Sequence, residues 1–291
     1  RLLPIAPGRA APGGVVAAAP IMPGMTAAQT HASPPPAFEH LQLAGDSRIA
    51  RVTLNRPDRL NALSPALLHE LIAASTWLAA QPQLRIVVLG GAGRAFCAGF
   101  DLDAMRAADA RIDRDTTDLG RRMAQSWAAI PAITIACVQG HCVGGGVVLA
   151  GVCDLRLAAD DAVFSIPEMA LGIPLGWGGV PLLTRLVGPA VALELVLDCR
   201  PFGAAQALAW RMVNRVVPAA ALMTQGQAWA ERLAGLPLQA LRATKQRFAQ
   251  AAEALSPTAG SEVDADALLA AFHDPETQAL QQRYLRERGR G

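Results

Sequence analysis

The pattern of apolar and polar residues in the first two thirds of the chain predicts a series of β-strands. The run 48–55, RIARVTLN, places apolar residues at strand-like intervals and ends in a turn. Leu84–Leu89 and Ile133–Val138 are continuous apolar runs, which are typical of strands buried on both faces of a sheet. Two shorter runs, Asp154–Leu157 and Val163–Ser165, predict further strands.

Helical patterns occupy the stretches between these strands. Leucines at helical spacing predict a helix that has Ser64 as its N-cap and runs to about Ala80. An amphipathic run at 115–130 predicts a second helix, and a short apolar helix is expected at 146–152. Strands and helices therefore alternate over 38–166, which predicts an α/β fold with a parallel sheet layered by helices.

The pattern changes after Gly178, where helices dominate and only one brief strand, Val213–Val217, is expected. We place a soft boundary near residue 200, between an α/β core at 38–200 and a helical region at 201–291. The helices predicted in this part lie at 179–187, 189–197, 203–210, 219–235, 237–253, 260–272 and 274–288.

Composition indicates a folded protein and argues against several functional classes. Hydrophobic residues make up 52% of the 291 positions and charged residues 17%, so the chain can bury a large core. The formal net charge is +2 and the basic residues are scattered, so we expect no nucleic-acid partner. Every apolar run of about 18 residues contains a charge or a breaker, so we expect no membrane span. The five cysteines are odd in number and lack metal-binding spacing, which predicts reduced thiols in a cytoplasmic protein without a metal.

The first 37 residues differ from the rest of the chain. They are rich in Ala, Pro and Gly, contain no acidic residue, and have breakers such as Pro12 and Pro20 where a signal peptide needs a continuous apolar stretch. We expect either a disordered leader or a reading frame that starts too far upstream, with the true start at Met22 or Met25.

The first segment that could take part in catalysis is Arg94–Leu102, which follows a buried strand. Gly99 forms a bend there, so a backbone N–H just beyond it can point into a cleft at the end of the strand. The alternative is an ordinary strand-to-helix loop in which Asp101 caps a helix. Taken alone, this segment favours the ordinary loop.

The second segment is Gly140-x-x-x-Gly144-Gly145-Gly146. Consecutive glycines that lead into a helix gather unpaired N–H donors at its positive end. A phosphate-binding loop would need a following Lys-Ser or Lys-Thr, which is missing here. Tight packing of a helix on a sheet is the alternative, and the segment alone favours neither.

The third segment contains Glu168, which follows Pro167 in an apolar neighbourhood. Burial among residues such as Phe164, Ile166 and Met169 should raise the pKa of its carboxyl group, which suits a group that takes up and returns a proton. A solvent-facing glutamate at the start of a helix is the alternative. Backbone donors together with one carboxylate are the parts of an enolate-stabilising proton-transfer site.

Together these segments resemble the enoyl-CoA hydratase/isomerase (crotonase) family over roughly residues 38–288. The matching segments are VTLNRPDRLNAL (52–63), FCAGFDL (96–102), GxxxGGG (140–146), CDLRLAADDAVFSIPE (153–168) and PEMALGIP (167–174). The resemblance implies a crotonase-like fold of repeated ββα units, with a helical C-terminal region that forms homotrimers or dimers of trimers. It also implies an acyl-CoA thioester substrate, as in fatty acid metabolism, and no separate cofactor, because coenzyme A is part of the substrate.

The resemblance assigns roles to individual residues. It implies that the backbone N–H groups of Phe100 and Gly145 form an oxyanion hole for the thioester oxygen, and that Glu168 is the catalytic acid and base. A basic residue of the last helix, Arg283 or Arg286, would lie near a phosphate. The residues expected to bind substrate and coenzyme A are Arg59, Leu60, Ala62, Ala95, Ala98, Asp101 and Leu102.

One departure from the family pattern bears on the reaction. Typical hydratases of the family carry an additional glutamate two residues after the glycine triplet, and this chain has Val148 there. A single carboxylate can move a proton between two carbons, whereas hydration also needs a group that activates water. The sequence therefore favours an enoyl-CoA isomerase, which migrates a double bond. An enoyl-CoA hydratase or hydratase-lyase is the alternative, and a non-catalytic protein that binds CoA esters or a partner is the second.

Three other residues refine this picture. Gly176 stands where dienoyl-CoA isomerases and aryl-CoA dehalogenases of the family have an aspartate, which counts against both activities. Trp177 either lines the acyl pocket or packs in the core. We expect the His141 ring to satisfy backbone groups under the edge of the sheet, with a role as a base as the alternative. The sequence does not identify the acyl group of the substrate.

Overall fold

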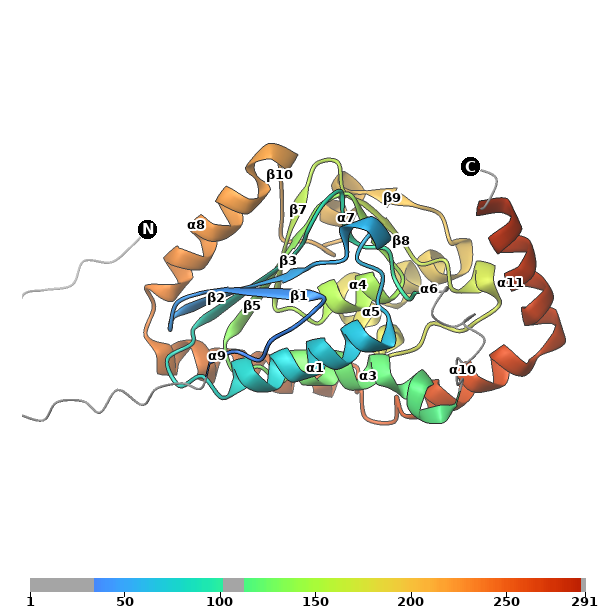
Figure 1. The fold of residues 1–291 in the computed structure, drawn as a ribbon, viewed down its shortest axis with the longest axis horizontal. Helices are drawn as coiled ribbons and strands as arrows, with labels where there is room; N and C mark the ends of the chain where they lie inside the picture. The colour runs from blue at the N-terminus through green and yellow to red at the C-terminus, as the bar shows by residue number, and fades with distance from the viewer. Residues whose placement is uncertain (1–33, 102–112, 289–291) are drawn as a thin grey trace, which may run out of the picture. The chain divides into compact units, whose positions relative to one another are not determined.

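The computed structural model describes residues 34–101 and 113–288, apart from the side chains of residues 285, 287 and 288. Residues from Pro34 onward form one compact unit with two β-sheets, as expected for an α/β fold (Figure 1). The large sheet contains β1 (Leu41–Gly45), β2 (Ile49–Leu54), β3 (Ile86–Gly91), β5 (Ile133–Val138), β7 (Leu155–Ala159) and β10 (Arg215–Val217), in that spatial order. The small sheet contains β4 (Ala95–Cys97), β6 (His141–Val143), β8 (Val163–Ser165) and β9 (Phe202–Gly203), also in that order.

The large sheet is parallel except at one edge. Its strands from β2 to β10 run in the same direction, and β1 pairs with β2 in the antiparallel sense. Successive side chains of a strand point to opposite faces. Ile86 and Val88 accordingly pack with α8 (Leu222–Ala234), whereas Val87 and Leu89 belong to the main core on the other face. Burial on both faces explains the continuous apolar runs in the sequence.

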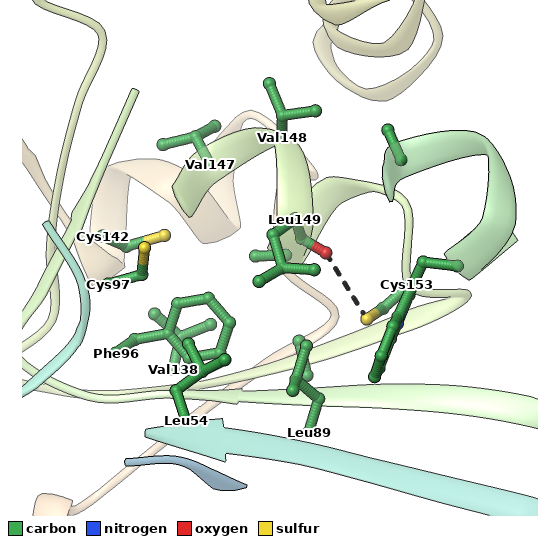
Figure 2. Close-up of a cluster of buried hydrophobic side chains, with 14 of the residues drawn as sticks. Leu54, Leu89, Phe96, Cys97, Val138, Cys142, Val147, Val148, Leu149 and Cys153 are labelled. Carbon is green, nitrogen blue, oxygen red and sulfur yellow. Dashed lines mark hydrogen bonds between the residues drawn. The ribbon is translucent and has the colours of Figure 1, made fainter. Parts of the chain in front are cut away.

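The main core lies between the large sheet and the helices α1 (Pro65–Ala79), α3 (Arg114–Ala128) and α4 (Gly145–Gly151). Figure 2 shows side chains of the large sheet, such as Leu89, facing Phe96 of the small sheet and Leu149 of α4. Helix α1 begins as the sequence predicts, because the Ser64 hydroxyl accepts a hydrogen bond from the Leu67 N–H. The core therefore connects both sheets to the helix that begins at the glycine triplet.

The helices after Gly178 agree closely with the sequence prediction. They are α5 (Gly179–Val187), α6 (Pro189–Asp198), α7 (Ala204–Ala209), the 3-10 helix η3 (Ala219–Ala221), α8, α9 (Leu238–Leu255), α10 (Val263–His273) and α11 (Pro275–Arg288). Two further 3-10 helices, η1 (Pro57–Arg59) and η2 (Met169–Leu171), lie earlier in the chain. Two strands lie beyond residue 200: β9 belongs to the small sheet and β10 belongs to the large sheet. The change of pattern near residue 200 is thus a change of secondary structure within one compact unit.

Some predicted boundaries were wrong. The strand expected at Leu84–Leu89 begins at Ile86 and continues through Gly90 and Gly91, which pair with Thr53 and Leu54 of β2. The strand expected from Asp154 begins one residue later, because the Asp154 carboxylate accepts hydrogen bonds from the backbone N–H and the hydroxyl of Thr134. β1, β4, β6 and β9 were not predicted.

The leader prediction concerns residues that mostly lie outside the described part of the chain, which begins at Pro34. Among the described helices, none combines the length and the apolar character that crossing a membrane requires.

Candidate active site

Each of the three candidate segments follows a strand of the small sheet. Phe100 lies three residues after β4, Gly144 directly after β6, and Glu168 three residues after β8. These three strands are parallel neighbours, so their carboxyl ends meet at the same edge of the sheet. The small sheet therefore brings together residues that lie up to 68 positions apart in the chain.

The first two segments approach each other at Gly99, which has a φ of +88°. A Cβ placed on Gly99 would lie 2.7 Å from the carbonyl oxygen of Val143 and 3.7 Å from the backbone nitrogen of Gly145. Only glycine allows this backbone conformation and this approach without strain. The bend before Phe100 thus lies next to the start of α4.

The backbone of Phe100 is oriented by Leu63, with which it forms a parallel β-bridge. The Leu63 N–H donates to the Gly99 carbonyl at 2.8 Å, and the Asp101 N–H donates to the Leu63 carbonyl at 3.1 Å. Because successive N–H groups of an extended chain point to opposite sides, the Phe100 N–H points away from Leu63. Within the described residues this N–H has no acceptor.

The Gly145 N–H is the second candidate donor. Gly145 is the first residue of α4, and the first N–H groups of a helix have no partner within the helix. No acceptor for it is found in the described part of the chain. Two unpaired N–H groups in adjacent segments are the parts from which an oxyanion hole can be made.

The carboxylate of Glu168 lies against the same glycine loop. Gly144 has a φ of +51° and a ψ of −116°, and a Cβ at this position would be 2.5 Å from the Glu168 Oε1 atom. Any side chain at Gly144 would therefore collide with the carboxylate. The glutamate and the glycine triplet, 24 residues apart, meet in the structure as the sequence analysis anticipated.

Burial determines the protonation behaviour of Glu168. Desolvation raises the pKa of its carboxyl group to about 7. Its Oε2 atom is buried, and no hydrogen-bond donor to it is present among the described residues. Glu168 precedes η2, and its carbonyl accepts hydrogen bonds from the N–H groups of Leu171 and Ile173. The backbone is thus fixed while the carboxylate can exchange a proton near neutral pH.

The residues expected to bind coenzyme A lie on two segments that run side by side. The Ala98 N–H donates to the Leu60 carbonyl at 2.9 Å, so the segment that contains Arg59 and Ala62 runs beside the segment that begins at Ala95. Leu60 has a φ of +49° and closes η1. The structure therefore brings these expected binding residues together beside the Phe100 N–H.

The side chain that joins these two segments, Asn61, was not predicted from the sequence. Asn61 is fully buried and has a φ of +56°. Its Nδ2 group donates to the carbonyls of Ala92 and Ala95, and its Oδ1 accepts from the Arg56 N–H. The turn residues at 55–58 were recognised in the sequence, and an asparagine just after such a turn was the available signal.

The helix-cap role expected for Asp101 concerns the segment that follows it, which lies outside the described residues. The Asp101 carboxylate forms a partly buried ion pair with Arg56, with 2.9 Å between the Nη1 and Oδ2 atoms. Arg56 also donates to the Ala62 carbonyl and so connects the two binding segments. Leu102, the next expected binding residue, lies outside the described residues.

The residues that mark the departure from the family pattern are also placed. Val148 is 2% exposed and lies in the second half of the first turn of α4, where Figure 2 shows it on the side away from Leu89. A Cβ on Gly176 would be 2.6 Å from the Leu268 side chain, so an aspartate does not fit there in this packing. The His141 side chain is exposed, so the expectation that its ring satisfies buried groups was wrong. Arg283 and Arg286 are exposed on α11.

Comparison with known families identifies a match over most of the chain. The sequence profile described as enoyl-CoA hydratase/isomerase matches residues 44–290. The chain is 37% identical over 220 residues to a probable enoyl-CoA hydratase of Mycobacterium bovis, an alignment that covers 74% of this chain and 83% of that protein. It is 36% identical over 183 residues to a peroxisomal delta(3,5)-delta(2,4)-dienoyl-CoA isomerase of Arabidopsis thaliana, covering 59% of this chain and 66% of that protein.

Solved structures give the same result. An enoyl-CoA hydratase from Mycobacterium avium subsp. paratuberculosis superposes with a TM-score of 0.78 at 27% identity, covering 85% of this chain and 99% of that chain. An enoyl-CoA hydratase/isomerase from Xanthobacter autotrophicus also gives a TM-score of 0.78, at 30% identity, with 86% and 94% of the two chains covered.

Proposed function

This chain belongs to the enoyl-CoA hydratase/isomerase family, and from that premise we propose that it moves a proton within an acyl-CoA thioester. The backbone N–H groups of Phe100 and Gly145 would hold the thioester oxygen, and Glu168 would carry the proton. The observation that supports this proposal most strongly is the contact of the Glu168 carboxylate with Gly144, one residue from a candidate donor. Loss of one such donor typically raises the barrier by about 2.7–4 kcal/mol.

We propose migration of a double bond as the specific reaction. The Glu168 carboxylate would take a proton from C2 of a 3-enoyl-CoA, and the electron pair of the broken C–H bond would move into the thioester. The resulting dienolate carries its negative charge on the oxygen that the two N–H groups face. Protonated Glu168 would then return the proton to C4, which leaves the double bond between C2 and C3 and restores the carbonyl.

Two observations support migration over hydration. The pKa of about 7 lets Glu168 both accept and release a proton near neutral pH. Val148, which is 2% exposed, has no group that could activate a water molecule. The competing candidate is hydration, which is favoured by the names of the relatives, because the Mycobacterium bovis protein and most of the others compared are called hydratases.

A panel of CoA esters distinguishes these reactions. We expect the protein to convert a 3-enoyl-CoA into a 2-enoyl-CoA of unchanged mass, and to add no water to a 2-enoyl-CoA. Glu168→Gln should reduce this rate about 10²–10⁴-fold while the protein still binds the ester. Glu194→Gln, which changes an exposed glutamate on α6, is the matched control and should keep full activity.

The possible outcomes separate three functions. A product heavier by one water would identify a hydratase, and cleavage of the acyl group would identify a hydratase-lyase. Binding of CoA esters without turnover of any of them would identify a binding protein. Undiminished isomerisation by Glu168→Gln would remove Glu168 from the reaction.

We also propose that the chain assembles as a homotrimer or a dimer of trimers. On α9, Phe248 is 74% exposed and Leu255 is 84% exposed, and an assembly would give such apolar side chains a partner. Light scattering from the purified protein tests this proposal, and a monomeric mass would contradict it.

A further inference from the structure

The backbone at Trp177 is held in a conformation that is unusual for a large residue. Trp177 has a φ of +62° and Gly178 a φ of +71°, so two consecutive residues are left-handed just before α5. For tryptophan such a conformation is strained and persists only where the surrounding structure imposes it. The strain is a reason to ask what this side chain does.

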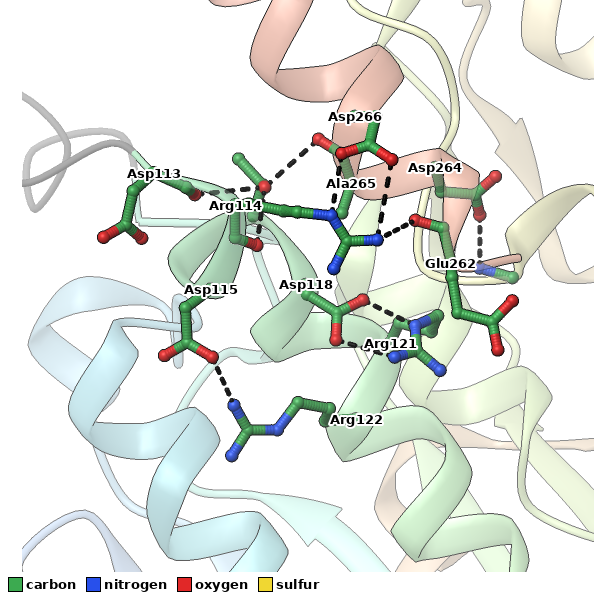
Figure 3. A network of polar contacts seen from close by, with 12 residues as sticks. Asp113, Arg114, Asp115, Asp118, Arg121, Arg122, Glu262, Asp264, Ala265 and Asp266 are labelled. Atoms are coloured by element: carbon green, nitrogen blue, oxygen red, sulfur yellow. Dashed lines mark hydrogen bonds and ion pairs between the residues drawn. The ribbon is translucent and has the colours of Figure 1, made fainter. Parts of the chain in front are cut away.

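Helix α10 supplies part of that constraint. The Gly178 N–H donates to the Asp264 carboxylate at 2.8 Å, and Figure 3 labels this aspartate. Helix α10 itself lies beside α3, where the buried Thr117 hydroxyl donates to the Ala265 carbonyl at 3.1 Å. The turn at Trp177 is therefore fixed relative to α3.

The indole ring fills a slot between two glycines. A Cβ on Gly120 of α3 would lie 1.9 Å from the nearest indole carbon, and a Cβ on Gly145 of α4 would lie 2.3 Å from another. Neither position could carry a side chain while the ring stays where it is. The ring is thus in close contact on two sides and cannot move toward either helix.

Both candidate donor residues contact this ring. Besides its contact with Gly145, the indole packs edge-on against the Phe100 ring, with 6.0 Å between centroids and an angle of 76° between planes. Trp177 and Phe100 are both partly exposed. Two aromatic side chains are therefore partly accessible beside the two donors.

We propose that Trp177 is a specificity-determining residue that restricts the acyl group at the carbons next to the thioester. This inference rests on the proposed function, because it assumes that the thioester oxygen is bound by the Phe100 and Gly145 N–H groups. When the two N–H groups hold the thioester oxygen, the acyl carbons next to the thioester must lie beside the Trp177 indole. Since the ring cannot yield, linear acyl groups fit and groups with a branch or a ring near the carbonyl do not.

Binding of esters that carry no enoyl double bond tests this inference without any turnover. We expect the wild-type protein to bind butyryl-CoA at least about tenfold more tightly than isovaleryl-CoA or benzoyl-CoA, measured by calorimetry. Trp177→Gly accepts the left-handed backbone and opens the slot, so the ratio of dissociation constants should fall below about threefold. The affinity for butyryl-CoA should change little.

Two milder substitutions, Trp177→Phe and its control Trp210→Phe, keep the test informative if Trp177→Gly does not fold. Trp177→Phe keeps a ring in the slot and should lower the ratio only partly. Trp210→Phe alters another tryptophan, which packs on Phe202 at 5.2 Å between centroids, and should leave the ratio unchanged.

Failure of this inference differs from failure of the proposed function. An unchanged ratio in both Trp177 variants, equal binding of all three esters by the wild type, or no binding of any ester would overturn the role of Trp177. A changed ratio in a protein that turns over no enoyl-CoA would support Trp177 and contradict the proposed reaction. Glu168→Gln should reduce turnover about 10²–10⁴-fold and preserve the ratio.

Discussion

The two sheets of this protein differ in size and in what they carry. The large sheet has strands of up to six residues and is buried on both faces. No candidate catalytic residue comes directly after its strands β2 and β3 in the chain. The small sheet has strands of only two or three residues, yet β4, β6 and β8 lead directly to Phe100, Gly145 and Glu168. The comparison teaches that both sheets contribute side chains to the main core, whereas the strands that lead to the candidate reacting groups belong to the small sheet.

The largest expected effect tests the large sheet. Leu89→Ala in β3 removes a fully buried side chain from the main core and should lower the free energy of unfolding by about 3 kcal/mol. Denaturant unfolding measures this loss. The rate of each folded molecule should stay the same, and a marked loss of rate at a temperature where the variant is folded would show that the two sheets are not separate in function.

The next effect tests the small sheet. Gly144→Ala places a Cβ 2.5 Å from the Glu168 Oε1 atom and requires alanine to adopt a φ of +51°. Displacing the carboxylate should lower kcat about 10²-fold, as measured by steady-state kinetics. Gly203→Ala is the control, since Gly203 has a φ of −89° and open space around its Cα. Equal rates for the two variants would argue against the position assigned to Glu168.

The same contrast explains how much could be predicted from the sequence. Ile133–Val138 was predicted with its final bounds, because a continuous run rich in β-branched residues is typical of a strand buried on both faces of a sheet. Strands β4 and β6, with three residues each, are too short for a period to appear. The close approach of Glu168 to Gly144 was anticipated only from motifs, since propensity carries no information about contacts distant in sequence.

Other features of the site depended on packing alone. The position of the Trp177 ring requires two glycines from different helices, Gly120 and Gly145, at the same place. The ion pair of Asp101 with Arg56 likewise joins residues 45 positions apart. No local pattern in the sequence indicates either arrangement, so both could be found only in the fold.

A smaller effect concerns the pH dependence of the small sheet. Glu168 must be ionised to accept a proton, and its pKa is raised to about 7. We therefore expect kcat/KM to fall about tenfold for each pH unit below 7 and to reach a plateau above it. A profile that is flat from pH 5 to about 8 would contradict a buried glutamate as the base.

The raised pKa also makes stability depend on pH. The folded state holds a proton on Glu168 up to about pH 7, whereas the unfolded chain loses it near the ordinary glutamate pKa of 4.5. Between these values the folded state binds more protons, so the contribution of Glu168 to stability is lost as the pH rises. Compared with Glu168→Gln, the wild-type protein should lose on the order of 3 kcal/mol of unfolding free energy from pH 4.5 to 7.5.

The smallest expected effect tests whether the start of α1 influences the candidate site beside the small sheet. Ser64→Ala removes the N-cap of α1 directly after Leu63, the residue that orients Phe100. We expect a loss of about 1 kcal/mol in unfolding free energy and no change in kcat. A fall in kcat would show that the cap of α1 also positions the Phe100 N–H.

The central claim is that the Phe100 and Gly145 N–H groups donate to the same thioester oxygen beside Glu168. Infrared difference spectroscopy on Glu168→Gln with a 2-enoyl-CoA labelled with carbon-13 at the carbonyl tests it most directly. Two donors should polarise the bond and shift its stretching band to lower frequency than in water. A band at the same frequency as in water would contradict the claim.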